Sequence, residues 1–140
     1  YETPDNEFVA QFIGSPAMNL LPGKITATGQ ETHVELTGGG KAVSTIPTRE
    51  GDLGKEVNIG VRPADMVPTE GEALYRGTVS YTEALGEVTL LYIDGASGDD
   101  GVIAKLPGIH KGLRGQEVQM AVDPAKVHLF HNGQSMRPKG

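Results

Sequence analysis

The stretch Glu56-Val57-Asn58-Ile59-Gly60-Val61 runs directly into Arg62-Pro63 and decides what kind of fold the chain forms. Val57, Ile59 and Val61 alternate with polar or small residues, and side chains two residues apart point to the same face of a strand. Proline has no backbone N–H, so Arg62-Pro63 ends the hydrogen-bonded run. The stretch therefore predicts a half-buried β-strand over residues 56–61.

Short β-prone runs of similar length lie on both sides of this stretch. They occupy residues 24–28, 32–37 and 41–46 before it, and residues 74–82, 88–93, 102–106, 117–122 and 127–130 after it. The 20 glycines and 9 prolines supply the turns that many short strands need. Residues 94–101, which hold three glycines and three aspartates, are typical of an exposed hairpin tip. The pattern predicts a mainly β fold, an OB-fold-like barrel or sandwich of two small β modules.

One short helix is expected ahead of the strands. Thr3 is suited to cap it, and Pro4 to its first position, where a missing N–H costs nothing. Residues 8–13 carry an apolar stripe with side chains one turn apart, and Gly14 offers a C-terminal cap. A helix this short is marginal alone, so its stripe has to pack on other structure.

Composition limits the classes of partner and the cellular locations that are compatible with the chain. The net charge of −6 argues against nucleic acid, because nucleic-acid-binding proteins use a basic face. Cysteine is absent, which excludes disulfide and thiolate chemistry and is compatible with the cytoplasm. No apolar run approaches the roughly 20 residues of a membrane-spanning helix. A chain that opens at residues 1–4 without Met resembles an excised fragment.

Glycine-rich segments raise the question of nucleotide binding. A phosphate-binding loop has the form G-x-x-x-x-G-K-[ST] and opens a helix. The pairs Gly23-Lys24, Gly40-Lys41 and Gly54-Lys55 lack the earlier glycine and the following hydroxyl residue. Gly38-Gly39-Gly40 also lies between two predicted strands, so we interpret it as a flexible hairpin turn.

Other kinds of catalytic or metal site find little support. His128 and His131 are three apart, which puts them on opposite faces of a strand, and we expect exposed turn histidines rather than a metal pair. Ser15 lies in a helix terminator and not in a nucleophile elbow. Glu83 and Glu87 flank a tight turn, for which a structural role is favoured over acid–base chemistry. No catalytic, cofactor-binding or metal-ligating residue is therefore assigned.

Several segments, read together, resemble one protein family. They occur in the family's order and span nearly all of the chain: residues 8–19, residues 59–63 with Asp65, residues 83–87 with Thr89-Leu90, and residues 115–116 with 123–133. The chain resembles the C-terminal regulatory domain, often labelled TOBE, of the ATP-binding subunit in ABC importers of the maltose and glycerol-3-phosphate type.

The resemblance implies a domain organisation and a set of partners. Residues 1–18 would be a linker helix from an ATPase domain absent here, residues 19–72 a first β module, and residues 73–140 a second, TOBE-like module. ATP and Mg would be bound by the absent domain. The chain would form a cytoplasmic homodimer at the inner face of the membrane, contacting its own ATPase domain, through it the membrane subunits, and possible regulatory proteins, but no nucleic acid. The cargo would be a sugar, a polyol or glycerol phosphate.

The same resemblance points to residues for the subunit interface. The motifs contain Arg62-Pro63, Glu83 and Gly86, and an ion pair that stabilises a local turn is the simpler interpretation for Arg62 and Glu83. Apolar or amphipathic contact candidates are Tyr81, Leu85, Leu129 and Phe130. Ordinary core packing is the simpler interpretation of Leu129 and Phe130.

Two other functions compete with a regulatory and dimerisation domain. Related OB-like modules in molybdate systems bind oxyanions, and such a sensor needs Ser, Thr and Lys gathered at a subunit junction. A nucleic-acid-binding barrel needs stacking aromatic residues on a basic face. Only 5% of the residues are aromatic and the net charge is negative, so this is the weakest alternative.

Overall fold

A computed structural model describes residues 18–95 and 101–136 of the chain. The helix expected from Thr3-Pro4 to Gly14 lies outside the described residues, as does most of the predicted hairpin tip at residues 94–101. The described part holds eleven strands and three short 3-10 helices, so the predicted mainly β fold is confirmed. None of its helices has the length and apolar character needed to cross a membrane.

The elements follow one another in two groups of strands. The strands are β1 (Asn19–Ala27), β2 (Thr32–Leu36), β3 (Lys41–Ser44), β4 (Glu56–Val61), β5 (Val67–Pro68), β6 (Tyr75–Ala84), β7 (Val88–Gly95), β8 (Val102–Pro107), β9 (Glu117–Ala121), β10 (His128–His131) and β11 (Gln134–Ser135). The 3-10 helices are η1 (Glu50–Asp52), η2 (Pro63–Asp65) and η3 (Pro124–Lys126).

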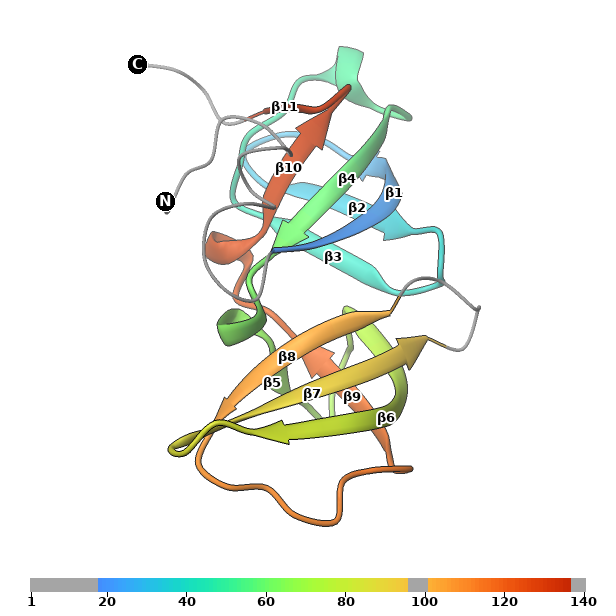
Figure 1. The fold of residues 1–140 in the computed structure, drawn as a ribbon. Helices are drawn as coiled ribbons and strands as arrows, with labels where there is room; N and C mark the ends of the chain where they lie inside the picture. The colour runs from blue at the N-terminus through green and yellow to red at the C-terminus, as the bar shows by residue number, and fades with distance from the viewer. Residues whose placement is uncertain (1–17, 96–100, 137–140) are drawn as a thin grey trace.

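The strands form two antiparallel sheets, one above the other in Figure 1. The six-stranded sheet, called the large sheet here, has the order β11-β10-β4-β1-β2-β3. The five-stranded sheet, called the small sheet, has the order β5-β9-β6-β7-β8. The chain passes from the large sheet to the small one before β5 and returns before β10. The large sheet therefore contains the first four strands together with β10 and β11, the last two strands of the described residues.

Strand β4 coincides with the predicted strand at residues 56–61 and pairs with β1 on one side and β10 on the other. Its apolar side chains face the core, with Ile59 and Val61 both 0% exposed. Gly60 is buried as well, because Met18 and Phe130 pack over it: a Cβ there would lie 2.5 Å from Met18 Sδ and 2.7 Å from Phe130 Cε2. The strand is thus covered on both faces at this point, and not half-buried along its whole length.

One hydrophobic core joins the two sheets. A single cluster of buried side chains includes members from the large sheet, such as Ile25 and Leu129, and from the small sheet, such as Val79, Leu91 and Met120. Because both sheets bury their inner faces in the same cluster, neither is expected to hold its packing without the other.

Polar contacts fix the junction between the sheets. The Asn19 side chain, at the start of β1, donates from Nδ2 to the Ile103 carbonyl oxygen and accepts from the Ile103 N–H at Oδ1, both at 2.9 Å. Ile103 lies in β8, an edge strand of the small sheet. Helix η2 also packs on β8. We call the paired Asn19–Ile103 hydrogen bonds the amide clamp.

Candidate functional site

The hairpin of β6 and β7 carries the largest group of predicted site residues. Its turn is closed by the Leu85 N–H, which donates to the Val88 carbonyl oxygen at 2.9 Å. Gly86 has φ +82°, a left-handed conformation that glycine adopts at little cost, which explains a glycine at this motif position. The Gly108 N–H donates to the Glu87 carbonyl oxygen and ties the turn to the loop after β8.

Two tyrosines and a glutamate meet on the hairpin. Tyr81 and Tyr92 are cross-strand partners, with ring centroids 5.4 Å apart and planes tilted by 56°. The Tyr92 hydroxyl donates to Glu83 Oε1 at 3.2 Å. Burial first, and the Glu83 carboxylate second, raise the pKa of the Tyr92 hydroxyl above its ordinary value of 10.0. Tyr92 therefore remains a hydrogen-bond donor at neutral pH, and Glu83 has a fixed position on the sheet.

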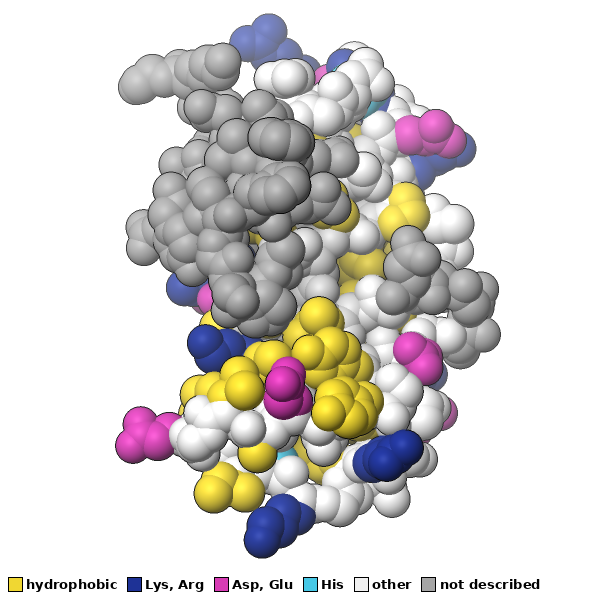
Figure 2. Space-filling view, viewed as in Figure 1, with side chains coloured by type: hydrophobic (Ala, Val, Ile, Leu, Met, Phe, Trp, Pro, Cys, Tyr) yellow, Lys and Arg dark blue, Asp and Glu magenta, His cyan; other side chains and the backbone are white. Residues whose placement is uncertain are grey.

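Large apolar side chains stay exposed at this hairpin. Tyr81 is 53% exposed, Leu85 49% and Ile109 66%. Ile109 follows Gly108, whose carbonyl oxygen accepts from the Thr89 hydroxyl at 2.9 Å, so its loop is fastened to the start of β7. We call Tyr81, Leu85 and Ile109 the hairpin patch. Figure 2 shows hydrophobic side chains gathered over the front of the small sheet, where β6 to β8 lie in Figure 1.

The structure brings together only some of the predicted site residues. Tyr81, Glu83, Leu85 and Gly86 share the hairpin, whereas Arg62 and the buried Pro63 lie at the junction beside η2. Leu129 and Phe130 in β10 are 0% and 1% exposed and belong to the interior. Sequence reasoning missed Ile109 and Tyr92, because exposure and cross-strand pairing depend on loop conformation and register.

The C-terminal histidines differ from expectation. His128 is buried at 6% exposure in β10, where it faces Gly60 of β4 across the ladder, so the prediction of an exposed turn histidine is wrong for this residue. The prediction failed because β10 becomes an inner strand only by pairing with β4, which is distant in sequence. His131 lies at the strand end, with Nδ1 3.0 Å from the Glu56 carbonyl oxygen. Among the described residues, no three His, Asp or Glu side chains gather as a metal site requires.

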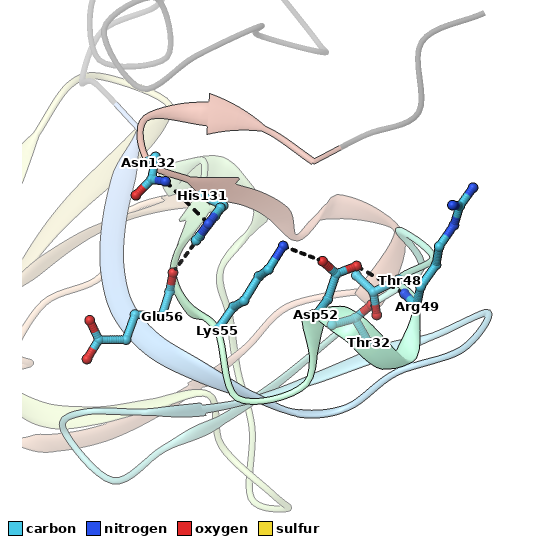
Figure 3. A network of polar contacts seen from close by, with 8 residues as sticks. All are labelled: Thr32, Thr48, Arg49, Asp52, Lys55, Glu56, His131 and Asn132. Atoms are coloured by element: carbon cyan, nitrogen blue, oxygen red, sulfur yellow. Dashed lines mark hydrogen bonds and ion pairs between the residues drawn. The ribbon is translucent and has the colours of Figure 1, made fainter.

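A polar network holds the loop before β4 (Figure 3). The Lys55 ammonium donates to Asp52 Oδ1 at 2.7 Å, and the Arg49 N–H donates to Asp52 Oδ2 at 3.0 Å. These two contacts, the Lys55 bond first, hold the pKa of Asp52 below its ordinary value of 3.8. These contacts hold the loop that leads into β4.

The buried hydroxyl groups also serve the fold. Thr32 Oγ1 donates to the Ile46 carbonyl oxygen at 2.6 Å and lies 2.8 Å from Thr48 Oγ1. Ser44 Oγ donates to the Val127 carbonyl oxygen at 2.7 Å. With Thr89, which bonds to Gly108, all buried Ser and Thr hydroxyls of the described residues have partners inside the molecule. They are therefore not a free Ser/Thr cluster of the kind an oxyanion sensor needs.

Comparison with known proteins identifies the family. A model described as the MalK OB fold domain matches residues 14–66, and a model described as the TOBE domain matches residues 59–130. The chain belongs to the TOBE domain family. The two matches overlap at residues 59–66, which is where β4 leads into η2 and the junction between the sheets.

Relatives of this TOBE domain include several transport ATP-binding proteins. The chain is 54% identical over 139 residues to the alpha-glucoside transport ATP-binding protein AglK of Rhizobium meliloti (strain 1021), covering 98% of this chain and 38% of that protein. It is 35% identical to the sn-glycerol-3-phosphate import ATP-binding protein UgpC of Paraburkholderia xenovorans (strain LB400), with 93% and 36% covered. It is 32% identical to the maltose/maltodextrin import ATP-binding protein MalK of Aliivibrio fischeri (strain ATCC 700601 / ES114), with 94% and 36% covered. The chain thus spans less than two-fifths of these relatives.

A solved structure confirms the OB-like fold. The TOBE domain superposes on the cytoplasmic molybdate-binding protein ModG, in a form with molybdate bound, with a TM-score of 0.68. The match covers 81% of this chain and 95% of ModG at 18% sequence identity, which establishes a shared fold. The predicted resemblance to the regulatory domain of importer ATP-binding subunits is confirmed by the family models and the relatives together.

Proposed function

We propose that this chain is the non-catalytic regulatory and dimerisation part of the ATP-binding subunit of an ABC importer. The observation that carries the proposal is the 54% identity to AglK along 98% of the chain. The higher identity to an alpha-glucoside transporter than to UgpC, at 35%, favours a sugar cargo over glycerol phosphate. ATP and Mg are bound elsewhere in the full-length subunit, which works at the inner face of the membrane with its membrane subunits.

The geometry of the glycine-rich segment supports a non-catalytic role. Gly38-Gly39-Gly40 forms the turn between β2 and β3 and opens no helix, so it lacks the helix N-terminus on which a phosphate-binding loop depends. The large sheet and the small sheet pack on one shared core, which can hold a contact surface in place.

The hairpin patch is the proposed contact between two copies of the chain. A two-fold interface uses the same surface on both partners, which suits a patch centred on one projecting hairpin. The backbone that carries Tyr81 and Leu85 is already ordered by β6 and its closed turn, so binding would cost mainly side-chain freedom. A stable contact needs about 800 Å² from each partner, so the patch would form its centre and the polar residues around it the rim.

A transport assay tests the proposed cargo. Deleting the gene that encodes the full-length subunit is expected to abolish uptake of an alpha-glucoside and to leave glycerol 3-phosphate uptake unchanged. Re-introducing the intact gene should restore uptake, and the same gene without the codons for this chain should not. Unchanged alpha-glucoside uptake in the deletion strain would contradict the assignment.

Sedimentation of the 140-residue chain tests the hairpin patch. Leu85→Asp should raise the dimer dissociation constant about tenfold or more, because a buried carboxylate replaces an apolar centre. Leu53→Asp is the matched control, since Leu53 is 58% exposed after η1 in the large-sheet region and outside the patch. A monomeric parent chain at high concentration, or equal effects of the two substitutions, would rule out this interface.

A further inference from the structure

A cavity of about 530 Å³ opens at the seam between the two sheets. We call it the seam cavity. It lies at the open end of the β6–β7 hairpin, where Arg76 and Gly95 stand, and thus at the end opposite the turn that carries the hairpin patch. The large sheet contributes the end of β2 and the start of β3, and the small sheet contributes the segment that enters β6.

The floor of the seam cavity is apolar. It is formed by side chains at the margin of the main core, each between 5% and 6% exposed: Leu21, Leu36, Leu74 and Tyr75. An apolar group seated there would cover core side chains that water otherwise reaches, and each Å² so removed from water is worth about 25 cal/mol. The volume also lies in the range of pockets that hold small organic molecules, about 300–1,000 Å³.

The glycine triplet forms one wall and leaves the space open. Gly39 has φ +102°, and its N–H donates to the Leu36 carbonyl oxygen at 2.9 Å. Gly40 lies so close to Leu74 that a Cβ would be 2.0 Å from the Leu74 carbonyl oxygen. The wall is therefore thin, because it has no side chains, and fixed, because it is packed against the other sheet. Such a cavity exists before any ligand arrives.

The lining of the seam cavity is locally positive. Among the described residues that line it, Lys41 and Arg76 are cationic and Glu72 is anionic, in a chain whose net charge is −6. Arg76 is exposed between the buried Tyr75 and Gly77, and its Nη2 donates to Gln119 Oε1 at 3.0 Å, so its guanidinium lies on the solvent side of the lining. In the described part of the lining, two cations and one anion around an apolar floor favour a ligand with a single negative charge and an apolar body.

We propose that the seam cavity binds a small organic monoanion with an apolar body, of the aromatic or branched-chain carboxylate or sulfonate class. The ligand would touch both sheets and so favour the arrangement in which they are packed together. The domain would then have a ligand-binding site separate from the hairpin patch. The inference goes beyond the proposed function and depends on neither the cargo nor the dimer.

A fluorescence titration of the 140-residue chain with anilinonaphthalene sulfonate tests the proposal. This probe has the proposed chemistry, an aromatic body and one sulfonate. Saturable binding with one site per chain is expected. Ala73→Phe, which places a ring at the cavity lining, should abolish it, while Lys41→Gln and Arg76→Gln should each weaken it about fivefold, as for exposed charge pairs. The affinity should fall as salt is added.

Matched variants separate the seam cavity from other apolar surfaces. Leu85→Asp removes the centre of the hairpin patch, and Lys24→Gln removes a cation that does not line this cavity; both should leave the affinity unchanged. Ala73→Phe can disturb packing. The double variant Lys41→Gln/Arg76→Gln, in which both replaced residues are exposed, is therefore an independent test of binding in the seam cavity. Absence of saturable binding, unchanged binding in the double variant, or loss of binding in Leu85→Asp would overturn the proposal. If the Leu85→Asp chain is monomeric and still binds the probe, binding in the seam cavity is independent of the proposed dimer.

Discussion

Replacing Gly40 with alanine is expected to lower the free energy of unfolding by about 2–3 kcal/mol, the cost typical of overpacking a close contact. The added Cβ would lie 2.0 Å from the Leu74 carbonyl oxygen and 2.9 Å from its carbon. Both are backbone atoms, so no flexible side chain can move away. Leu74 is itself held by its N–H, which donates to the Met120 carbonyl oxygen at 2.9 Å. Relief therefore requires the two sheets to separate locally, which exposes part of their common core.

Urea unfolding followed by circular dichroism measures this loss, and Gly51→Ala is its matched control. A Cβ at Gly51 meets nothing within 4 Å, and its backbone is not left-handed. Its substitution should change stability by less than about 1 kcal/mol, in the stabilising direction if the unfolded chain loses entropy. Equal effects of the two alanines would show that the close approach of Gly40 to Leu74 does not limit the packing of the sheets.

The glycine triplet shows how far the sequence can be read. Its turn between two strands was predictable from composition, and the structure confirms a turn between β2 and β3. The different tasks of its members were not predictable. Gly39 supplies a left-handed backbone, whereas Gly40 supplies the space for a contact with Leu74 of the other sheet. A contact between residues so distant in sequence leaves no local pattern.

Strand prediction succeeded where alternation was regular and failed where packing overrode propensity. Residues 56–61 are strand β4 as expected. Strand β1 begins at Asn19, whereas the prediction began it at Lys24. The prediction started late because Pro22 and Gly23 both disfavour a strand locally. In the fold Gly23 is required, since a Cβ there would lie 2.7 Å from Val34 Cγ1. Tertiary contacts with β2 and β4 thus extend the strand through residues that weaken it alone.

The candidate site was only partly accessible to sequence reasoning. A motif of turn residues marked Glu83, Leu85 and Gly86, because turn chemistry is local. Ile109 joins the hairpin patch through a hydrogen bond between two loops, and such a bond has no sequence signature. Leu129 and Phe130 look like contact residues in the sequence but are buried, because β10 pairs with β4 inside the large sheet.

Replacing Asn19 with alanine should remove the amide clamp and cost about 2–3 kcal/mol of stability. Two hydrogen bonds of 2.9 Å disappear at once, and the Ile103 N–H and carbonyl oxygen both lose their partner. Partly buried backbone groups without partners carry a desolvation penalty that exceeds the net value of the bonds themselves. The loss should therefore be greater than for an ordinary surface amide.

Gln119→Ala provides that comparison, since Gln119 Oε1 accepts one exposed hydrogen bond from Arg76, and its loss should cost less than about 1 kcal/mol. Hydrogen exchange at the Ile103 amide gives a local readout: Asn19→Ala should raise its exchange rate more than those of its β8 neighbours. Uniform acceleration across β8 would mean that the substitution loosens the whole sheet and that the clamp has no local role. Asn19 opens β1 and Ile103 lies on the edge of the small sheet, so a local effect would identify one side chain that sets how the small sheet is held against the first strand of the large one.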